Sequence, residues 1–321
     1  MVKYTYGGEY MNTKQKEFLT INELIENIKN KGLLIKDENN LKEVLKHHNY
    51  YFITGYKEPF KNSLGYYKEN VYFEDILELY HFDKKLKLIF AEILFEIEQN
   101  VKTTFLNNFC DRYGYKELDL IDPNNYDIFN QYLTDTIKKL NDQIHWYGKT
   151  NQAVSYYKGQ YGFVPIWILV KVLSFGMIRD LIMNQKSNDK DHICKTLVND
   201  KKLKVCEVQN FLELLITYRN ICCHDDKLLG FIHSKVNIRT TKYHYQFSLL
   251  KNSNSYIQGK KDLFAALIAI KYFVDKNTYS KFIDNISNLI DEYSSKITGI
   301  TKQEMLKYMY LPENFVEIKN L

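Results

Sequence analysis

Hydrophobic residues recur at three- and four-residue steps over most of the chain, which is the spacing that places them on one face of an α-helix. The longest such pattern starts near Phe73 and continues to about Phe109. Its apolar stripe is formed by Leu79, Phe82, Leu86, Ile89, Ile93, Ile97 and Val101. A helix of this length is suited to be the spine of a helical bundle.

Shorter helices are predicted on both sides of this spine. Thr20 and Glu23 have the spacing of a capping box, so a helix begins after Thr20, and Gly32 marks its end. Pro165 suits the first turn of another helix. The predicted helices outside the spine cover about residues 20–31, 37–48, 126–146, 166–183, a short stretch from 189, 204–224, 262–274, 278–295 and 301–309.

One segment has a different pattern. From Val236 to Leu250 polar and hydrophobic residues alternate, which predicts a β-hairpin inserted between helices. We therefore predict a mainly α protein with an N-terminal helical lobe over residues 1–70, a helical bundle over 71–300 and a C-terminal tail over 301–321 that packs on the bundle.

The charge of the chain permits a nucleic-acid partner without demanding one. Its 44 Lys and Arg residues stand against 39 Asp and Glu residues, a formal net charge of +5. The 27 tyrosines and 19 phenylalanines are able to stack on unpaired bases. Because Asn, Ile and Lys are frequent too, an AT-rich coding sequence explains the aromatic total better than a function does.

The compartment is predicted from the cysteines and the apolar stretches. The 5 cysteines are odd in number and form no disulfide framework, as is typical of a reducing cytoplasm. The first ten residues lack the apolar run of a signal peptide. The stretch from Phe163 to Ile178 is interrupted by Lys171 and is too short to span a bilayer. We expect a cytoplasmic protein without a membrane partner.

The predicted helix over residues 204–224 carries a polar stripe on an otherwise apolar surface. The stripe consists of Gln209, Glu213, Thr217, Asn220 and His224, at steps of four, four, three and four residues. Because the other faces are apolar, the helix is expected to be buried, and its stripe to face a cleft or a polar network.

Three residues at the end of this helix suit the cleavage of RNA. His224 is the type of side chain that transfers protons near neutral pH, and Arg219 offers a permanent charge and forked donors to a phosphate. Asn220 lies between them and is able to orient either. Since RNA supplies its own 2′-OH nucleophile, no metal and no cofactor are needed. The alternative is that these residues cap helix carbonyls or pair with Asp225 or Asp226.

Short motifs spread over about residues 18–315 carry a family resemblance. They are Phe18-Leu19-Thr20, Gly32-Leu33, Asn49-Tyr50-Tyr51-Phe52 with Gly55-Tyr56 and Pro59-Phe60, Phe82-Asp83, Glu96-Ile97-Glu98, Val164-Pro165-Ile166-Trp167, Leu173-Ser174-Phe175-Gly176, Tyr218-Arg219-Asn220 with Cys222-Cys223-His224, and Tyr310-Leu311-Pro312-Glu313-Asn314-Phe315. In this order they resemble the AbiD/AbiF-type abortive-infection family, whose core is similar to the HEPN ribonuclease domain.

The resemblance implies a HEPN-like helical bundle and a phage-defence endoribonuclease that works without a metal, with Arg219, Asn220 and His224 as catalytic residues. HEPN enzymes commonly join two copies of the motif in one site. Because this chain has a single copy, a symmetric homodimer is implied. The resemblance also implies an RNA partner, either as the substrate or as a structured noncoding RNA.

The chain departs from the family pattern next to the motif. The family usually has Ala before the histidine and a basic or aromatic residue after it, whereas this chain has Cys223 and the pair Asp225-Asp226. The closing Trp of the family is replaced by Phe315. The acidic pair would either weaken phosphate binding or hold His224 protonated.

A second set of candidate residues lies in the predicted hairpin. Basic and aromatic residues are interleaved there, as in RNA-contacting segments. The candidate RNA-binding residues are Lys235, Arg239, Lys242, Tyr243 and Tyr245. The alternative is a solvated hairpin edge that its lysines protect from aggregation.

Two other functions remain open at this point. In the first, the protein is an RNA-binding module, in which Arg219 and His224 bind a noncoding RNA without cutting it. In the second, it is an interaction scaffold whose polar stripe is an interface. Glu92, Glu96 and Gln99 share a face of the spine and would either bind a metal or pair with Arg219 or a lysine.

Overall fold

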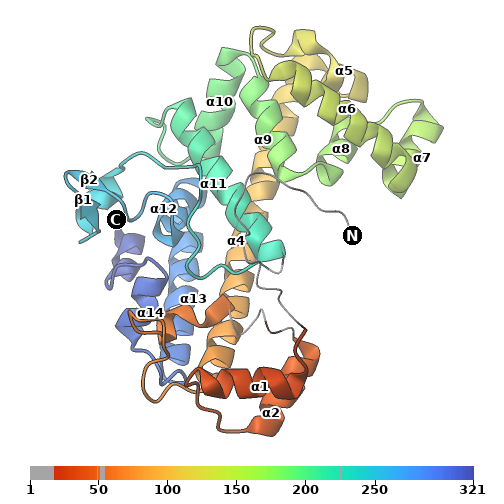
Figure 1. Ribbon diagram of the computed structural model, residues 1–321. Coiled ribbons are helices and arrows are strands. Elements are labelled where there is room, and N and C mark those ends of the chain that lie inside the picture. The colour runs from red at the N-terminus through yellow and green to blue at the C-terminus, as the bar shows by residue number, and fades with distance from the viewer. Residues whose placement is uncertain (1–17, 49, 51–54, 225) are drawn as a thin grey trace, which may run out of the picture. The chain divides into compact units, whose positions relative to one another are not determined.

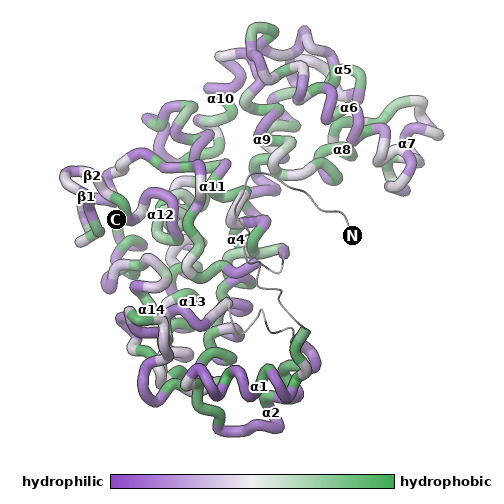
Figure 2. Tube along the Cα trace, viewed as in Figure 1, coloured by the Kyte–Doolittle hydropathy of each residue, from purple (hydrophilic) through white to green (hydrophobic). Residues whose placement is uncertain are grey.

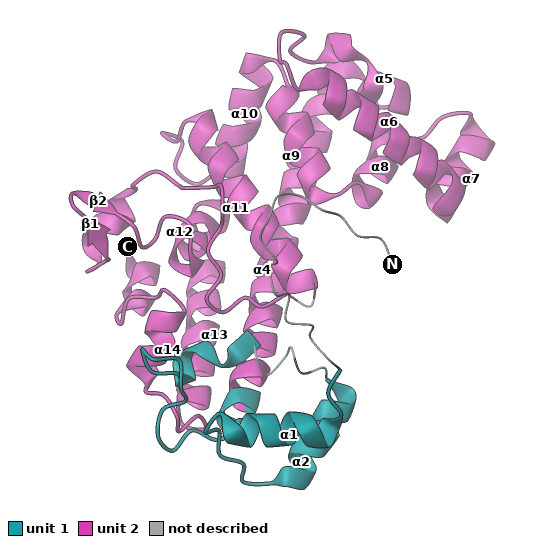
Figure 3. Cartoon of the chain, in the orientation of Figure 1, with its two compact units in different colours: residues 1–77 teal, residues 78–321 magenta. Residues whose placement is uncertain are grey.

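The computed structural model describes residues 18–48, 50, 55–224 and 226–321. The chain forms two compact units, Met1–Leu77 and Glu78–Leu321, and their boundary falls within one long helix (Figure 3). Most of the described residues are helical (Figure 1), which confirms the predicted mainly α fold. The family motif at residues 49–52 lies outside the described residues, except for Tyr50.

The first unit is built around two helices, α1 (Ile21–Asn30) and α2 (Glu38–His47), and a short 3-10 helix, η1 (Glu58–Phe60). The predicted capping box is present, because the Thr20 hydroxyl accepts from the Glu23 backbone N–H at 3.4 Å and the Glu23 carboxylate accepts from the Thr20 N–H at 2.7 Å. In Figure 2 the tube of α1 changes between hydrophilic and hydrophobic colours along its length, as expected of a helix with one buried face.

Helix α4 (Phe73–Tyr113) is the predicted spine. Its apolar stripe is buried from Leu79 to Phe109 except at Ile89, which is half-buried and next to fully buried Phe90. Phe90 contacts Phe282 with ring centroids 5.1 Å apart, and Phe109 contacts Tyr126 at 5.8 Å. Opposite ends of α4 in the second unit therefore pack on different parts of the chain, as Figure 1 shows.

The segment after α4 contains α5 (Glu117–Ile121), η2 (Pro123–Asn125), α6 (Leu133–Thr150) and α7 (Gln152–Tyr161). The helix predicted from residue 126 begins seven residues later, at Leu133. The carboxylate of Asp127 accepts from the Phe129 N–H at 3.2 Å, and the side-chain oxygen of Asn130 accepts from the Tyr132 N–H at 3.1 Å. These local bonds compete with helix formation, which explains the later start.

The helix predicted over residues 166–183 is two helices, α8 (Ile166–Val172) and α9 (Phe175–Asn184). The break occurs at Ser174, whose hydroxyl accepts from the Met177 N–H at 3.1 Å and caps α9. Pro165 precedes α8 as its N-cap.

Among the remaining helices, α11 packs against α9, α10 and α12, and α13 packs against α12, α14 and η4. Nearly every side chain of α12 is buried, so this helix forms the centre of the core. The helices are α10 (Ser187–Leu197), α11 (Val205–Cys223), α12 (Leu263–Phe273), α13 (Lys276–Ser294), α14 (Lys302–Tyr308) and the 3-10 helix η4 (Phe315–Asn320).

A small β-hairpin is present, but not over residues 236–250. Its strands, β1 (Lys251–Asn252) and β2 (Ser255–Tyr256), follow the predicted segment, which is irregular apart from the 3-10 helix η3 (Lys242–Gln246). The ring of His244 is fully buried and forms hydrogen bonds with the backbone of Thr241 and Gly259. These backbone groups are therefore bonded to a side chain and not to a neighbouring strand.

Within the described part of the chain, no helix combines the length and the apolar character needed to cross a membrane.

Candidate active site at the end of helix α11

The three predicted catalytic residues lie together at the C-terminal end of α11. Arg219 and Asn220 belong to its last turn, and His224 is the C-cap, with φ −114° and ψ 174°. The backbone N–H of His224 still donates to the Asn220 carbonyl at 3.1 Å. The side chains of Asn220 and His224 are exposed, whereas Arg219 is half-buried. The helix end therefore presents the motif at the surface of the second unit.

The guanidinium of Arg219 is held by a buried carboxylate. Its Nε donates to Glu98 Oε2 at 2.8 Å, and Lys102 Nζ lies 2.8 Å from the other oxygen of Glu98. Only 8 % of the Glu98 side chain is exposed. Arg219 also lies over the ring of Phe95, and its Nη1 is 3.4 Å from the side-chain oxygen of Asn220. One carboxylate thus holds two cations, so the cluster keeps a net positive charge suited to a phosphate.

The chain that follows His224 is fastened to α4 by two side chains. Lys87 Nζ donates to the carbonyl of His224 at 3.4 Å and to that of Asp226 at 3.0 Å. One turn earlier on α4, the Asp83 carboxylate accepts from the N–H groups of Leu228 and Leu229 at 3.3 and 2.9 Å. Asp83 and Lys87 are both buried. They hold the backbone after His224 in place, and α11 holds the backbone before it.

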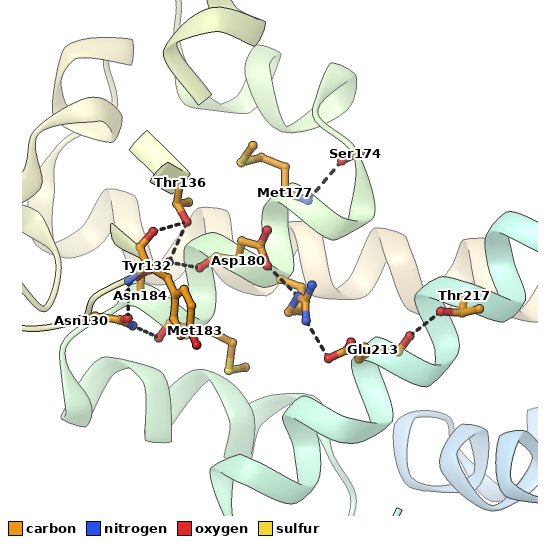
Figure 4. Close-up of polar contacts among 11 residues, drawn as sticks. Asn130, Tyr132, Thr136, Ser174, Met177, Asp180, Met183, Asn184, Glu213 and Thr217 are labelled. Carbon is orange, nitrogen blue, oxygen red and sulfur yellow. Dashed lines mark hydrogen bonds and ion pairs between the residues drawn. The ribbon is translucent and has the colours of Figure 1, made fainter. Parts of the chain in front are cut away.

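The middle of the polar stripe on α11 faces a polar network. Arg179 Nη1 of α9 donates to Glu213 at 3.1 Å, and the Thr217 hydroxyl donates to the Glu213 carbonyl at 3.1 Å (Figure 4). The Thr217 hydroxyl also bonds to His233 Nε2 at 3.0 Å. Arg179 also pairs with the neighbouring Asp180, whose pKa is raised by burial. Of the two alternatives predicted for the stripe, the polar network is found at Glu213 and Thr217, whereas Asn220 and His224 are exposed at the helix end.

This network continues from α9 to α6. The amide of Asn184 donates to the Thr136 hydroxyl at 3.1 Å and to the Asp180 carbonyl at 2.8 Å, and Asn130 donates to the Met183 carbonyl (Figure 4). Helix α9 is thus hydrogen-bonded both to α11 and to α6 with the segment before it, so these contacts hold α9 in place against α11.

The five predicted RNA-binding residues are not gathered at the motif. The rings of Tyr243 and Tyr272 lie 5.6 Å apart, and Tyr272 stacks on Phe211, which precedes His224 by 13 residues or about 20 Å of helix. Tyr243 is only 5 % exposed, so its ring belongs to the core and is not accessible to a base.

The other four of these residues are exposed: Lys235, Arg239, Lys242 and Tyr245. Lys235 is connected to α11, because its backbone N–H donates to His233, which bonds Thr217.

Glu98, Lys87 and Asp83 were not singled out as site residues by the sequence pattern. Glu92, Glu96 and Gln99, which were considered as partners of Arg219 or as metal ligands, are exposed on α4, and Glu98 takes the place next to Arg219. The spacing of Glu98 could have indicated its role. It lies four positions after buried Leu94 and three before buried Val101, so an acidic residue falls on the apolar face of the helix, where a charge needs a partner. Among the described residues, no three His, Cys, Asp or Glu side chains gather into a metal-binding cluster.

The cysteines next to the motif differ in environment. Cys222 is half-buried, and burial raises the pKa of its thiol to about 12, whereas Cys223 is exposed. All five cysteines are free. Of the two acidic residues after the motif, Asp225 lies outside the described residues and Asp226 is exposed.

A cavity of about 330 Å³ opens between α4 and α10, away from the motif. It is lined by Thr104, Asn107, Asn108, Asp111, Arg112, His192 and Thr196. The three motif residues line no part of it. Their position on an open helix end fits a long substrate better than a small enclosed molecule.

A model of a protein family described as Abi-like protein matches residues 43–230, more than half of the chain. The protein belongs to this abortive-infection family. The Abi-like match includes α4, which supplies Glu98, and α11 with the whole motif, and it ends at Gly230, directly after the segment that Asp83 fastens. The family predicted from the sequence motifs is thereby confirmed. Neither a curated protein nor a solved structure matches the chain.

Proposed function

We propose that this abortive-infection protein acts as a metal-independent endoribonuclease at the end of α11. The observation that carries the proposal is the combination of an exposed histidine, His224, with Arg219, whose guanidinium is oriented by buried Glu98. A proton-transfer group and a fixed cation are the two elements that phosphodiester cleavage by an internal nucleophile requires.

In the proposed reaction the 2′-OH of the substrate attacks the adjacent phosphorus. The bond from 2′-O to phosphorus forms and the bond from phosphorus to 5′-O breaks, which leaves a 2′,3′-cyclic phosphate and a 5′-OH end. The 2′-OH loses a proton, and the leaving oxygen gains one. His224 transfers protons, Arg219 stabilises the charge on the phosphorane, and Asn220 orients His224 or the phosphate.

Two proton transfers are needed, and each chain contributes one motif histidine. The proposal therefore includes a symmetric homodimer, in which two copies of the helix end form a composite site on HEPN-like bundles. Lys235, Arg239, Lys242 and Tyr245 are proposed to contact RNA beyond the site, and the buried Tyr243 is left out.

The decisive variant is His224→Ala, measured on total RNA with EDTA present. Loss of a general acid or base typically lowers the rate by about 10²–10⁴. Arg219→Lys keeps the charge but loses the forked donor set, so it should recover only part of the activity. An RNA with a 2′-deoxy sugar at the cut position should not be cleaved.

His47→Ala is the matched control, because His47 is likewise an exposed histidine in the last turn of a helix, α2. It should cleave like the wild type. Full activity of His224→Ala, or cleavage that EDTA stops and magnesium restores, would refute the mechanism. Tight RNA binding without cleavage by the wild type would instead support the RNA-binding module.

A further inference from the structure

Residues 143–173 combine many aromatic residues with a lack of acidic ones. The segment contains seven aromatic residues and three lysines, and no aspartate or glutamate. It covers the second half of α6, all of α7 and α8, and the turns between them. An aromatic segment with only positive charges suits a polyanion whose bases are able to stack.

A short backbone pairing places Tyr115 beside this segment. The N–H of Ile166 donates to the Tyr115 carbonyl at 2.8 Å, and the N–H of Glu117 donates to the Val164 carbonyl at 2.9 Å. The rings of Tyr115 and Trp167 are consequently stacked, with centroids 5.9 Å apart and planes at 22°. Tyr115 and Trp167 are 45 % and 43 % exposed, so part of the stacked pair is accessible to a ligand.

Further exposed rings follow on the neighbouring helices. Tyr156 and Tyr161 of α7 are 58 % and 56 % exposed, and Tyr161 stacks with Tyr157 at 5.5 Å. Trp146 of α6 is 57 % exposed, and α6 packs against α7. Phe163 connects the two groups of rings, because it directly follows the α7 cap and contacts Tyr115 at 5.8 Å.

The charged groups around these rings favour an anion. Lys116 Nζ lies 5.0 Å from the Phe163 ring, and Lys158 and Lys171 are exposed. The two nearby carboxylates are used by the backbone: Glu117 is buried and accepts from the Val164 N–H at 2.6 Å, and Asp119 accepts from the Lys116 N–H at 2.9 Å. Lys116, Lys158 and Lys171 are therefore exposed beside the rings, and Asp142, one turn before Trp146 on α6, is an exposed carboxylate at the edge of this group.

We propose that Tyr115, Trp146, Tyr156, Tyr161 and Trp167 form an aromatic surface that binds unpaired bases of single-stranded RNA, with Lys116, Lys158 and Lys171 pairing to its phosphates. The inference rests on the proposed function in taking RNA as the ligand, and it adds a contact surface on elements other than α11. Stacking accepts any base, because every base has a π-face. The surface thus selects unpaired strands over duplexes rather than a particular sequence.

The chain offers a direct optical test, because Trp146 and Trp167 are its only tryptophans. The full-length protein carrying His224→Ala is titrated with a single-stranded oligouridine of 12 nucleotides and with a 12-base-pair RNA duplex. The single strand should quench the tryptophan fluorescence to saturation, and the duplex should quench it much less at equal concentration.

Affinity is then measured by anisotropy of the labelled single strand. Trp167→Leu and Tyr161→Ala, each in the His224→Ala background, should weaken binding by about 5- to 100-fold, as expected for the loss of one stacked base. Phe129→Ala is the matched control, because Phe129 is an aromatic residue that is 91 % exposed but precedes α6. It should leave the affinity unchanged. Circular dichroism and the melting temperature show whether each variant is folded.

Unchanged affinity of folded Trp167→Leu and Tyr161→Ala, or equal quenching by strand and duplex, would overturn the inference. So would a change of oligomeric state in place of a change in RNA binding, which would make the surface a protein interface. Since binding is measured without cleavage, its loss rejects this surface alone. A wild type that binds the strand through these residues but never cuts RNA rejects the nuclease and leaves the surface standing.

Discussion

Glu98 lies in the buried stripe of α4 and holds two cations, Arg219 and Lys102. Removing one member of such a cluster leaves a buried or half-buried charge without its partner, which is costly. The orientation of the Arg219 guanidinium therefore depends on a residue of a different helix, 121 positions away in the sequence.

This dependence predicts a coupling free energy between Glu98 and Arg219. Glu98→Gln and Arg219→Gln should each lower the free energy of unfolding by about 2 kcal/mol, since each leaves a partly buried charge without its partner. In urea unfolding, the double variant should be less destabilised than the sum of the two, by about 1–3 kcal/mol. Glu92→Gln, at an exposed position of the same helix, should change stability by less than about 0.5 kcal/mol. A coupling near zero would mean that the pair contributes nothing in solution.

His244 predicts a dependence of stability on pH. Burial lowers its pKa from 6.5 to about 4, so the unfolded chain takes up the proton below pH 6.5 and the folded chain only near pH 4. Stability from this residue is complete above pH 6.5 and is lost as the pH falls, by about 2 kcal/mol at pH 5. Urea unfolding of the wild type and of His244→Gln at pH 5 to 7.5 measures the difference.

Between pH 7.5 and pH 5 the free energy of unfolding of the wild type should fall by about 2 kcal/mol relative to that of the variant, even if the variant is less stable at pH 7.5. The carboxyl of Asp262, whose pKa burial raises to about 6, titrates in the same range with the opposite sign. Both proteins carry it, so the difference between their profiles isolates His244. Parallel profiles would show that His244 does not titrate as proposed.

Arg219, Asn220 and His224 could be proposed as catalytic residues from their types, because Arg, Asn and His suit a phosphodiester and share one helix end. Glu98, Lys87 and Asp83 could not be assigned to this site. Their roles depend on how α4 docks against α11, and no spacing within either helix contains that information. Tyr243 was a candidate by type alone, and its burial is a property of the tertiary packing against Tyr272.

At the scale of elements, the helices with clear periodicity were predictable and their interruptions were not. The apolar pattern continues across Ser174, so the sequence favours one helix over residues 166–183, although the Ser174 hydroxyl caps a new one. Likewise, alternation in residues 236–250 is typical of a strand, but buried His244 takes the backbone bonds that a strand would need. In both places a side-chain hydrogen bond decides against the local pattern.

The turn between α4 and α5 contains a glycine whose substitution should lower stability. Gly114 has φ +113°, and a Cβ there would lie 2.4 Å from an Asp119 oxygen. Gly114→Ala should lower the melting temperature, by the equivalent of about 1–3 kcal/mol, since it adds strain and a clash. It should also shift the fluorescence of Trp167, because Tyr115 follows the turn and stacks on that residue.

Gly159→Ala is the matched control in a neighbouring helix, α7. A Cβ at Gly159 meets nothing within 4 Å, and a helix interior favours alanine by about 0.5–1 kcal/mol. The two substitutions should therefore move the melting temperature in opposite directions. Equal stability of the Gly114→Ala variant and the wild type would show that the turn relaxes without cost.

At the scale of the whole molecule, the proposed composite site ties activity to association. One chain has a mass of 38.3 kDa, and light scattering at micromolar concentration should give twice that value. On dilution the cleavage rate per chain should fall once dimers dissociate, because each copy supplies one histidine. Full activity per chain in samples that scatter as monomers would reject the dimer and require both proton transfers within one chain.

The separation of Glu98 from Arg219 also has a consequence for biosynthesis. The 121 residues between them take about 6–24 s to translate at typical bacterial rates, and during this time α4 exists without the helix that completes its charge cluster. The interval is longer for Asp83, because its carboxylate accepts from backbone N–H groups 145 and 146 residues further along the chain. The geometry of the proposed site is therefore incomplete during synthesis until Leu229 has left the ribosome, so the nascent chain lacks the proposed activity up to that point.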